Sequence, residues 1–289
     1  MHPVLIELPI FGGFPIHTYG VMLALAVFQA AILMRKWGNE DKLPGDDLYD
    51  MAFWTLLGGL AGARLEYIRV SWPEFEGNYL MLLNLRKGGL VFYGGLIGAF
   101  VTFVVSARRR KLPIARVLDV VAPVVPLGHF WGRIGCLAAG CCFGKEAPGL
   151  GWAITFTDKH CWDPRTALAN TEKLPVCLTD PLFTPLHPTQ VYEALYSLSL
   201  GLFLVWMRKR RRFHGQLILL YLSLYPILRS INELYRGDTK RGFFMEAQLG
   251  QLISNAQFLS LLIVLGSSIL GVIFWNLSKQ TSPVDGSKS

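Results

Sequence analysis

The sequence predicts an all-α integral membrane protein of about seven transmembrane helices, with a small external head between the fourth and fifth spans. Three observations predict this class. Hydrophobic residues make up 52% of the 289 residues and charged residues only 17%, so the composition departs from that of soluble proteins in both respects. The apolar residues form blocks of roughly 20, the length at which an α-helix crosses about 30 Å of hydrocarbon. Lysines and arginines follow these blocks in short clusters.

Each apolar block predicts one span. The spans are expected at residues 16–34, 48–70, 90–107, 115–138, 188–207, 215–233 and 252–277. The N-terminus lacks the charged start, short apolar core and small-residue cleavage site of a secretory signal peptide. The first block is therefore expected to stay in the membrane as a span.

The cationic clusters predict the orientation of the spans. They follow the first, third, fifth and seventh spans and consist of Arg35–Lys36, Arg108–Lys111, Arg208–Arg212 and Lys279. By the positive-inside rule this side is the cytoplasm, so the N-terminus is expected outside and the C-terminus inside. Because the cations flank the spans, the formal net charge of +8 does not indicate nucleic-acid binding.

The chain is expected to form a single transmembrane domain over residues 1–289. Segment 139–186 is rich in Gly, Pro and polar residues, which predicts a compact external head. Within it, Cys161 and Cys177 are expected to form a disulfide worth roughly 3 kcal/mol. Residues 280–289 are expected to be a disordered cytoplasmic tail.

Charged residues inside the spans are the first indication of function. Each costs at least about 2.5–3.5 kcal/mol at the bilayer centre, so those retained are expected to face a protein cavity. They are Arg64, Glu66, Asp119, Arg133, Glu193, Arg229 and Glu233, with Arg236 just beyond the sixth span. All except Asp119 fall in the outer halves of their spans, which predicts a polar cavity open towards the outer leaflet.

Structural alternatives for these residues stay open. Arg229 and Glu233, at i and i+4, can neutralise each other, and Arg133 can be a snorkelling arginine flanked by glycines. Glycines are dense at the same level, at 58–62, 94–98 and 128–135. They indicate either close helix packing or room for a phosphate group.

Six blocks of sequence occur in order along nearly the whole chain. They are His17-Thr-Tyr19-Gly20, the glycine-rich run 88–98, Asp119 with Pro123 and Pro126, Gly132-Arg133-Ile-Gly135, His187-Pro-Thr-Gln190-Val-Tyr192-Glu193, and Tyr225 to Arg236 with Arg229 and Glu233 between them. In this order the blocks resemble the signature blocks of the prolipoprotein diacylglyceryl transferases.

The resemblance implies an enzyme of the bacterial inner (cytoplasmic) membrane. It would transfer the sn-1,2-diacylglyceryl group from phosphatidylglycerol to the lipobox cysteine of a prolipoprotein, forming a thioether and releasing glycerol phosphate. The implied partners are phosphatidylglycerol, the prolipoprotein lipobox peptide and the bilayer, with no nucleic acid and no cofactor. Two alternatives stay open: a divergent paralogue acting on another lipid or acceptor, and an anion-binding membrane transporter.

The same resemblance implies the site residues. Arg133 and Arg229 would be the essential pair, with Arg133 binding the lipid phosphate. The residues expected to bind substrate are Tyr19, Arg64, Gly94, Gly95, His187, Gln190, Glu193, Tyr225, Glu233 and Arg236. Arginine suits this chemistry because it stays charged and presents a planar fork that matches phosphate.

The chain departs from the family pattern at the expected base. Tyr93 stands where family members commonly have a histidine, so a histidine base cannot be carried over. Tyr93 is the first candidate base and His187 the second, and the alternatives are an interfacial tyrosine and a helix-start histidine. A free thiol near arginines is already partly ionised near neutral pH, so the reaction can also proceed without a dedicated base.

A second departure follows Gly135, where the usual Asn-rich stretch is replaced by Cys136-Leu-Ala-Ala-Gly-Cys141-Cys142. No histidine lies at zinc-finger spacing from these cysteines, so no metal site is expected. The favoured alternatives are one further disulfide with a free thiol, or three small buried residues.

Overall fold

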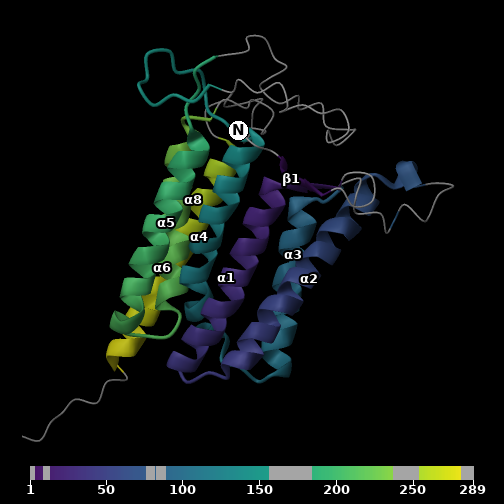
Figure 1. The fold of residues 1–289 in the computed structure, drawn as a ribbon. Helices are drawn as coiled ribbons and strands as arrows, with labels where there is room; N and C mark the ends of the chain where they lie inside the picture. Colours follow the sequence, from purple (N-terminus) through teal and green to yellow (C-terminus); the bar gives the residue numbers. More distant parts are fainter. Residues whose placement is uncertain are drawn as a thin grey trace, which may run out of the picture. The chain divides into compact units, whose positions relative to one another are not determined.

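The computed structural model describes residues 4–8, 14–75, 82, 89–155, 184–236 and 254–280. Seven α-helices and a two-stranded sheet lie within these residues (Figure 1). The elements are β1 (Val4–Leu8), β2 (Phe14–His17), α1 (Thr18–Glu40), α2 (Gly45–Val70), η1 (Trp72–Phe75), α3 (Phe92–Arg109), α4 (Ile114–Ala139), α5 (Thr189–Met207), η6 (Arg208–Arg210), α6 (Gln216–Glu233) and α8 (Asn255–Gln280).

The expectation of a helical protein is confirmed, and each predicted span overlaps one helix. Sequence analysis missed β1 and β2, which pair antiparallel from Val4 opposite His17 to Leu8 opposite Phe14. Strands this short carry too few residues for a period of two to stand out. Within the described residues, three helices are long and apolar enough to cross a membrane: Thr18–Glu40, Ile114–Ala139 and Asn255–Asn276.

Parts of the predicted head and tail lie outside the described residues. The structure describes the head only up to residue 155 and from residue 184. Cys161 and Cys177 fall between these limits, so their predicted disulfide is untested, and the same holds for residues 281–289 of the tail.

The chain forms two compact units. Unit 1 consists of Met1–Ala26, Leu118–Thr157 and Leu182–Ser289. Unit 2 consists of Val27–Val117 and Asp158–Pro181. Most of the expected site residues belong to unit 1, whereas Arg64, Tyr93, Gly94 and Gly95 belong to unit 2.

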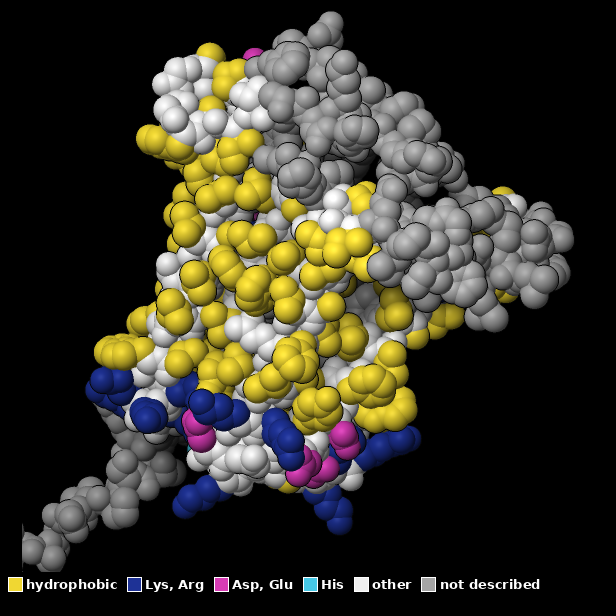
Figure 2. All heavy atoms as spheres, in the orientation of Figure 1, with side chains coloured by type: hydrophobic (Ala, Val, Ile, Leu, Met, Phe, Trp, Pro, Cys, Tyr) yellow, Lys and Arg dark blue, Asp and Glu magenta, His cyan; other side chains and the backbone are white. Residues whose placement is uncertain are grey.

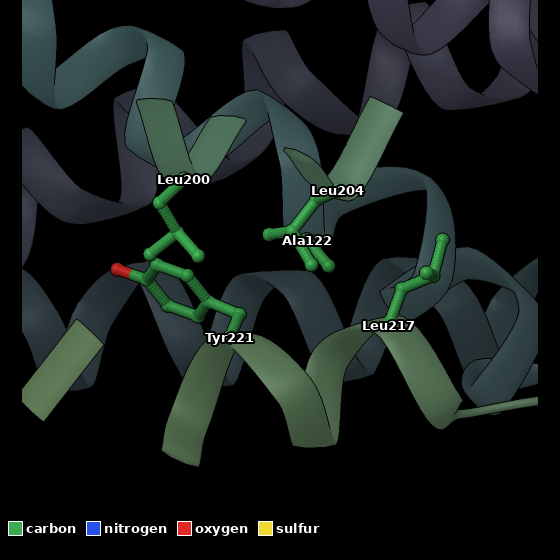
Figure 3. Close-up of a cluster of buried hydrophobic side chains, with 5 residues drawn as sticks. All are labelled: Ala122, Leu200, Leu204, Leu217 and Tyr221. Atoms are coloured by element: carbon green, nitrogen blue, oxygen red, sulfur yellow. The ribbon is translucent and has the colours of Figure 1, made fainter. Parts of the chain in front are cut away.

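The core of unit 1 joins three helices. Leu200 and Leu204 of α5 point towards Leu217 and Tyr221 of α6, and Ala122 of α4 completes the cluster (Figure 3). Helix α8 packs along α6, where the hydroxyl oxygens of Ser223 and Ser267 lie 2.8 Å apart. This packing holds α4, α5 and α6 together.

Asp119 of α4 is a structural residue. Its carboxylate accepts hydrogen bonds from the backbone N–H groups of Gly215 at 2.8 Å, Leu217 at 2.9 Å and Ile218 at 3.4 Å. The first N–H groups of a helix have no partners within the helix, and Asp119 supplies partners to those of α6. This cap explains the one charge that the sequence places towards the inner ends of the spans.

The outer surfaces of the helices are apolar. Figure 2 shows hydrophobic side chains over the helices and Lys and Arg side chains at helix ends. Phe28, Ile97 and Phe100 are each more than 60% exposed, as expected for side chains that face lipid. In unit 1 the Arg210 guanidinium lies 4.1 Å from the Trp206 ring, an arrangement typical of a membrane interface.

Candidate active site

A buried carboxylate joins three helices of unit 1. Glu193 lies one turn into α5 and is 1% exposed. Its Oε1 lies 2.9 Å from Nη2 of Arg133 on α4 and accepts a hydrogen bond of 3.1 Å from the Tyr225 hydroxyl on α6. Its Oε2 accepts a hydrogen bond of 3.2 Å from Nδ2 of Asn232. The sequence-predicted residues Arg133, Glu193 and Tyr225 therefore form one cluster.

The electrostatics of this cluster follow from its burial. A buried ion pair contributes little net stability, but removing one partner leaves the other charge uncompensated. Glu193 is the counter-ion that lets Arg133 remain in an apolar helix. The Arg133 side chain keeps 22% of its surface exposed, whereas that of Glu193 keeps 1%.

The second predicted arginine also has a carboxylate partner. Nη1 of Arg229 lies 2.5 Å from Oε2 of Glu233, one turn further along α6. This geometry confirms the i, i+4 ion pair considered from the sequence. Tyr225 lies one turn before Arg229, so the contact to Glu193 and this ion pair follow one another along α6. Both arginines expected to act on phosphate are thus held by glutamates.

His187 and Arg236 lie in a tight backbone crossing outside the helices. Gly144 N–H donates to the His187 carbonyl at 2.9 Å, and Gly144 forms a β-bridge with Arg236. A Cβ added at Gly144 would lie 2.5 Å from the Cβ of His187, so only glycine fits this crossing. The Nδ1 of His187 lies 3.2 Å from the hydroxyl of Tyr192. These contacts support the helix-start role considered for His187.

Gln190 and Thr189 fix the chain that follows α4. The Gln190 amide donates to the Cys141 carbonyl at 2.7 Å, and the Thr189 hydroxyl donates to the Cys142 carbonyl at 2.8 Å. Both side chains are 1% exposed. Gln190, predicted to bind substrate, therefore holds the cysteine-containing turn in place.

Tyr19 packs against α4 close to Arg133. A Cβ added at Gly135 would lie 2.9 Å from Cδ2 of Tyr19, so the glycine allows this approach. At Gly132 and Gly128 an added Cβ would meet no described atom within 4 Å. The expected close approach beside Arg133 is thus confirmed at Gly135, and among the described residues Gly132 faces open space.

Arg64 of unit 2 holds the segment before α3. Its guanidinium donates to the carbonyl oxygens of Leu82 at 3.0 Å and Gly89 at 3.2 Å. It also lies 5.5 Å from the centroid of the Tyr67 ring and 5.6 Å from that of Phe75. These contacts account for a charged residue that is only 9% exposed.

The glycines of unit 2 pack helix against helix. A Cβ added at Gly62 would collide with the carbonyl oxygen of Gly94, and one added at Gly98 would collide with that of Gly58. A Cβ added at Gly95 would lie 3.3 Å from the Cβ of Ala63. The packing alternative considered for these glycines is confirmed, because α2 and α3 meet backbone to backbone. Tyr93, beside them, is 68% exposed.

Sequence analysis missed His129, although it lies one turn before Arg133 on α4. Its ring lies 5.0 Å from that of Tyr225, and its Nδ1 is buried with no hydrogen-bond partner among the described residues. The i, i+4 spacing from Arg133 was the signal that could have identified it. Asn232 was missed too, because a neutral amide near the end of a span does not stand out as a charged residue does.

The three cysteines after Arg133 converge. Cys136, Cys141 and Cys142 are free thiols, and their Sγ atoms lie within 4.8 Å of one another. No disulfide joins these three residues, and Cys141 is exposed, so neither alternative favoured from the sequence describes them.

Apolar helices with one buried arginine–glutamate pair between α4 and α5 and a second pair within α6 define a helical membrane protein with a buried cluster of charged residues. The family model for prolipoprotein diacylglyceryl transferase matches residues 3–274, and the chain belongs to this family. The family is one of membrane transferases in lipoprotein biosynthesis.

Curated relatives carry the same name. The chain is 31% identical over 285 residues to the phosphatidylglycerol–prolipoprotein diacylglyceryl transferase of Clostridium tetani, covering 96% of this chain and 98% of the relative. It is 32% identical over 273 residues to that of Rhodospirillum rubrum, covering 91% and 90%. A second enzyme of this name from Clostridium perfringens is 29% identical over 267 residues, covering 92% and 93%.

Proposed function

We propose that this protein is a phosphatidylglycerol–prolipoprotein diacylglyceryl transferase of the bacterial inner membrane. It moves the sn-1,2-diacylglyceryl group of phosphatidylglycerol to the thiol of the lipobox cysteine. The observation that carries the proposal is the family match over residues 3–274, which includes every residue of the Arg133–Glu193 cluster.

The reaction replaces a carbon–oxygen bond with a carbon–sulfur bond. The lipobox thiol loses its proton, and the thiolate attacks the glyceryl CH2 that is bonded to the phosphate oxygen. That carbon–oxygen bond breaks, and its electron pair leaves with glycerol phosphate. The site must therefore bind a phosphodiester and stabilise the second negative charge that the phosphate gains.

Arg133 is proposed to bind the phosphodiester. Its guanidinium is held by Glu193, and Glu193 is fixed in turn by Tyr225 and Asn232. Such a frame keeps the guanidinium in one orientation before the lipid arrives, which is how preorganised charge lowers a barrier. An added Cβ at Gly128 or Gly132 would meet no described atom within 4 Å, and this open space on the same helix supports a phosphate site beside Arg133.

Arg229 is proposed to stabilise the leaving phosphate. Paired with Glu233, it adds no net charge to the resting site, so the cluster is tolerated in an apolar environment. When the phosphate gains charge, arginines in this low-dielectric environment attract it more strongly than they would in water. Tyr19 and Arg236 complete the proposed cavity around Arg133.

Five residues implied by the resemblance have structural contacts that explain them. They are Arg64, Gly94, Gly95, His187 and Gln190. We propose that each of them holds the backbone within its own unit and is not a direct ligand of the lipid. Tyr93, the first base candidate from the sequence, is 68% exposed and is given no role in the proposed reaction.

The proposed topology has seven spans with the N-terminus outside and the C-terminus in the cytoplasm. The three helices that meet the length and composition of a span support it, as do the apolar outer faces of the others. The lipobox peptide then reaches the site from the outer side, where secreted prolipoproteins emerge.

A transfer assay tests the proposal. Purified protein in detergent is mixed with phosphatidylglycerol and a synthetic lipobox peptide, and the mass of the peptide is measured. We expect a mass gain of one diacylglyceryl group with the cysteine peptide, and none with a peptide in which serine replaces that cysteine. Phosphatidylethanolamine is the donor control. Equal transfer from it would support the divergent paralogue, and no transfer from phosphatidylglycerol would contradict the proposal.

A further inference from the structure

Three thiols next to the candidate arginine play no part in the proposed function. The Sγ atoms of Cys136, Cys141 and Cys142 lie within 4.8 Å of one another. Two sulfur ligands on one tetrahedral zinc ion lie about 3.8 Å apart, from zinc–sulfur bonds of about 2.3 Å. The three sulfur atoms are therefore already close to the spacing that one metal ion requires.

The backbone at the end of α4 brings these thiols together. Gly140 has a φ of +69° and ends the helix, with Gly140 N–H donating to the Leu137 carbonyl and Cys141 N–H to the Cys136 carbonyl. These two bonds form a Schellman motif, which reverses the chain at the end of a helix. Cys142 has a φ of +62°, unusual for a residue with a side chain.

Contacts from α5 hold the turn in this shape. The carbonyl of Cys141 accepts from Gln190 and that of Cys142 accepts from Thr189, both of them buried. Two residues later, Gly144 is fixed to His187. Because the turn is held on both sides of Cys142, the three thiols are preorganised. Metal binding then does not have to order a mobile loop.

The charges around the thiols suit an anionic metal complex. The positively charged guanidinium groups of Arg133 and Arg236 lie near enough to the Cys142 thiol to interact with it electrostatically. Three thiolates around a divalent ion carry one net negative charge, which the arginines compensate.

The donor atoms select the class of metal. Thiolate ligands favour soft or borderline ions such as Zn²⁺ over Mg²⁺ and Ca²⁺, which prefer oxygen. Three protein ligands with one further position are typical of a catalytic zinc site, whereas structural sites have four. Cys141 is exposed and Cys136 and Cys142 are partly buried, so an outside ligand has access to the ion.

We propose that Cys136, Cys141 and Cys142 bind one zinc ion, and that the fourth position of the ion takes the thiol of the acceptor cysteine. The second half of this inference rests on the proposed function. Cys136 lies one turn beyond Arg133 on α4, so a thiol on the ion lies beside the arginine proposed to bind the phosphate.

The proposal gives the acceptor thiol a means of activation. A thiol that coordinates zinc gives up its proton, which passes to solvent. The zinc-bound thiolate then attacks the glyceryl CH2, the carbon–oxygen bond breaks, and glycerol phosphate leaves with the electron pair. The neutral thioether is a weaker ligand than the thiolate and leaves the ion. Zinc does not change its oxidation state at any step.

Cobalt titration of purified protein tests the metal site by itself. The background is Cys161→Ser with Cys177→Ser, because it leaves only the three proposed ligands among the five cysteines of the chain. We expect one equivalent of Co²⁺ to give thiolate-to-cobalt charge-transfer absorption. Changing Cys136, Cys141 or Cys142 to Ser should each reduce this absorption, with helicity by circular dichroism unchanged. No absorption in the background protein would overturn the proposal.

Adding peptide to the cobalt protein tests the fourth position. We expect a lipobox peptide with cysteine to increase the charge-transfer absorption and one with serine to leave it unchanged. Equal spectra with both peptides would overturn the substrate half of the proposal.

Alkylation of freshly purified protein gives an independent test of the metal site. If two of the three thiols react only after reduction, a disulfide takes the place of the ion.

The two proposals can fail separately. Full transfer activity in wild-type protein after removal of metal by a chelator, verified by elemental analysis, would reject zinc activation while the transferase function stands. A cobalt spectrum that responds to the cysteine peptide, in a protein that transfers no lipid, would support the site and reject the proposed function. We expect chelation to lower transfer at least tenfold and added Zn²⁺ to restore it.

Discussion

Glu193 brings α4, α5 and α6 together through one carboxylate. The sequence marked it as a polar residue in an apolar span, which identified the position but not the role. Its partners Arg133, Tyr225 and Asn232 come from two other helices, and pairing across helices leaves no local pattern in sequence. The structure therefore changes Glu193 from an expected substrate ligand to the residue that positions Arg133.

Replacing Glu193 with Gln tests this role. The amide removes the negative charge that compensates Arg133, so we expect the free energy of unfolding to fall by about 3–5 kcal/mol, the cost of breaking a buried ion pair. Chemical denaturation in detergent measures the change. Glu146→Gln, at an exposed position, is the matched control and should change stability by less than about 0.5 kcal/mol. Similar stability losses in both variants would contradict the assigned role.

Tyr93 is the residue at which the sequence departs from its family's expected base. It is 68% exposed, and the three-cysteine site offers another way to ionise the acceptor thiol. We therefore expect Tyr93→Phe to lower the rate of transfer less than tenfold. Steady-state transfer assays over a range of pH measure this. A loss of roughly 10²–10⁴-fold, typical of removing a general base, would instead assign the base to Tyr93.

At the level of residues, the sequence identified charged side chains that are costly to bury in an apolar span. It did not identify contacts that depend on how the backbone folds. Charges in apolar spans led to Arg133, Glu193, Arg229 and Glu233. Arg64 was found by the same argument. Its guanidinium, however, donates to backbone carbonyl oxygens, and these contacts cannot be predicted from a sequence pattern. The cysteines were seen as a departure from the family, but their convergence depends on the turn at Gly140.

At the scale of elements, the helices were predictable because each contains one long apolar block. The spacing of glycines also indicated close helix packing as one of two alternatives, and in the structure Gly58 and Gly62 of α2 meet Gly98 and Gly94 of α3. What could not be predicted is which helix each glycine run contacts. The hairpin of β1 and β2 was missed because its strands have only five and four residues.

Gly62→Ala tests the packing of α2 against α3. The added methyl group would collide with the carbonyl oxygen of Gly94, so the helices must separate or shift. We expect a stability loss of about 1–3 kcal/mol, as for other overpacked positions. Thermal unfolding in detergent measures it. Gly266→Ala in α8, where an added Cβ meets no described atom within 4 Å, should be neutral or slightly stabilising. Equal destabilisation by both changes would contradict the close contact.

At the scale of the whole molecule, the cationic clusters carry the proposed topology. Reporter fusions after Arg110, Arg212 and Lys279 are expected to show cytoplasmic activity, and a fusion within segment 139–186 is expected to show periplasmic activity. The reason is the excess of Lys and Arg on one side of the predicted spans. Periplasmic activity after Arg110 would contradict the topology and would place Arg133 in the inner half of the membrane.

Arg133 is the residue at which the Glu193 cluster, the open space at Gly132 and the cysteine site meet. Its replacement therefore affects the central claim more directly than any other change.

The decisive measurement is the rate of diacylglyceryl transfer by purified Arg133→Ala protein, with Arg210→Ala at the helix end of unit 1 as the control. We predict a loss of at least about 10²–10³-fold for Arg133→Ala, because the preorganised charge that binds the phosphodiester is removed. Arg133→Lys should recover only part of the rate, since lysine lacks the planar fork. Arg210→Ala should transfer at close to the wild-type rate. Inserted, helical Arg133→Ala protein that transfers diacylglyceryl at the wild-type rate would contradict the account.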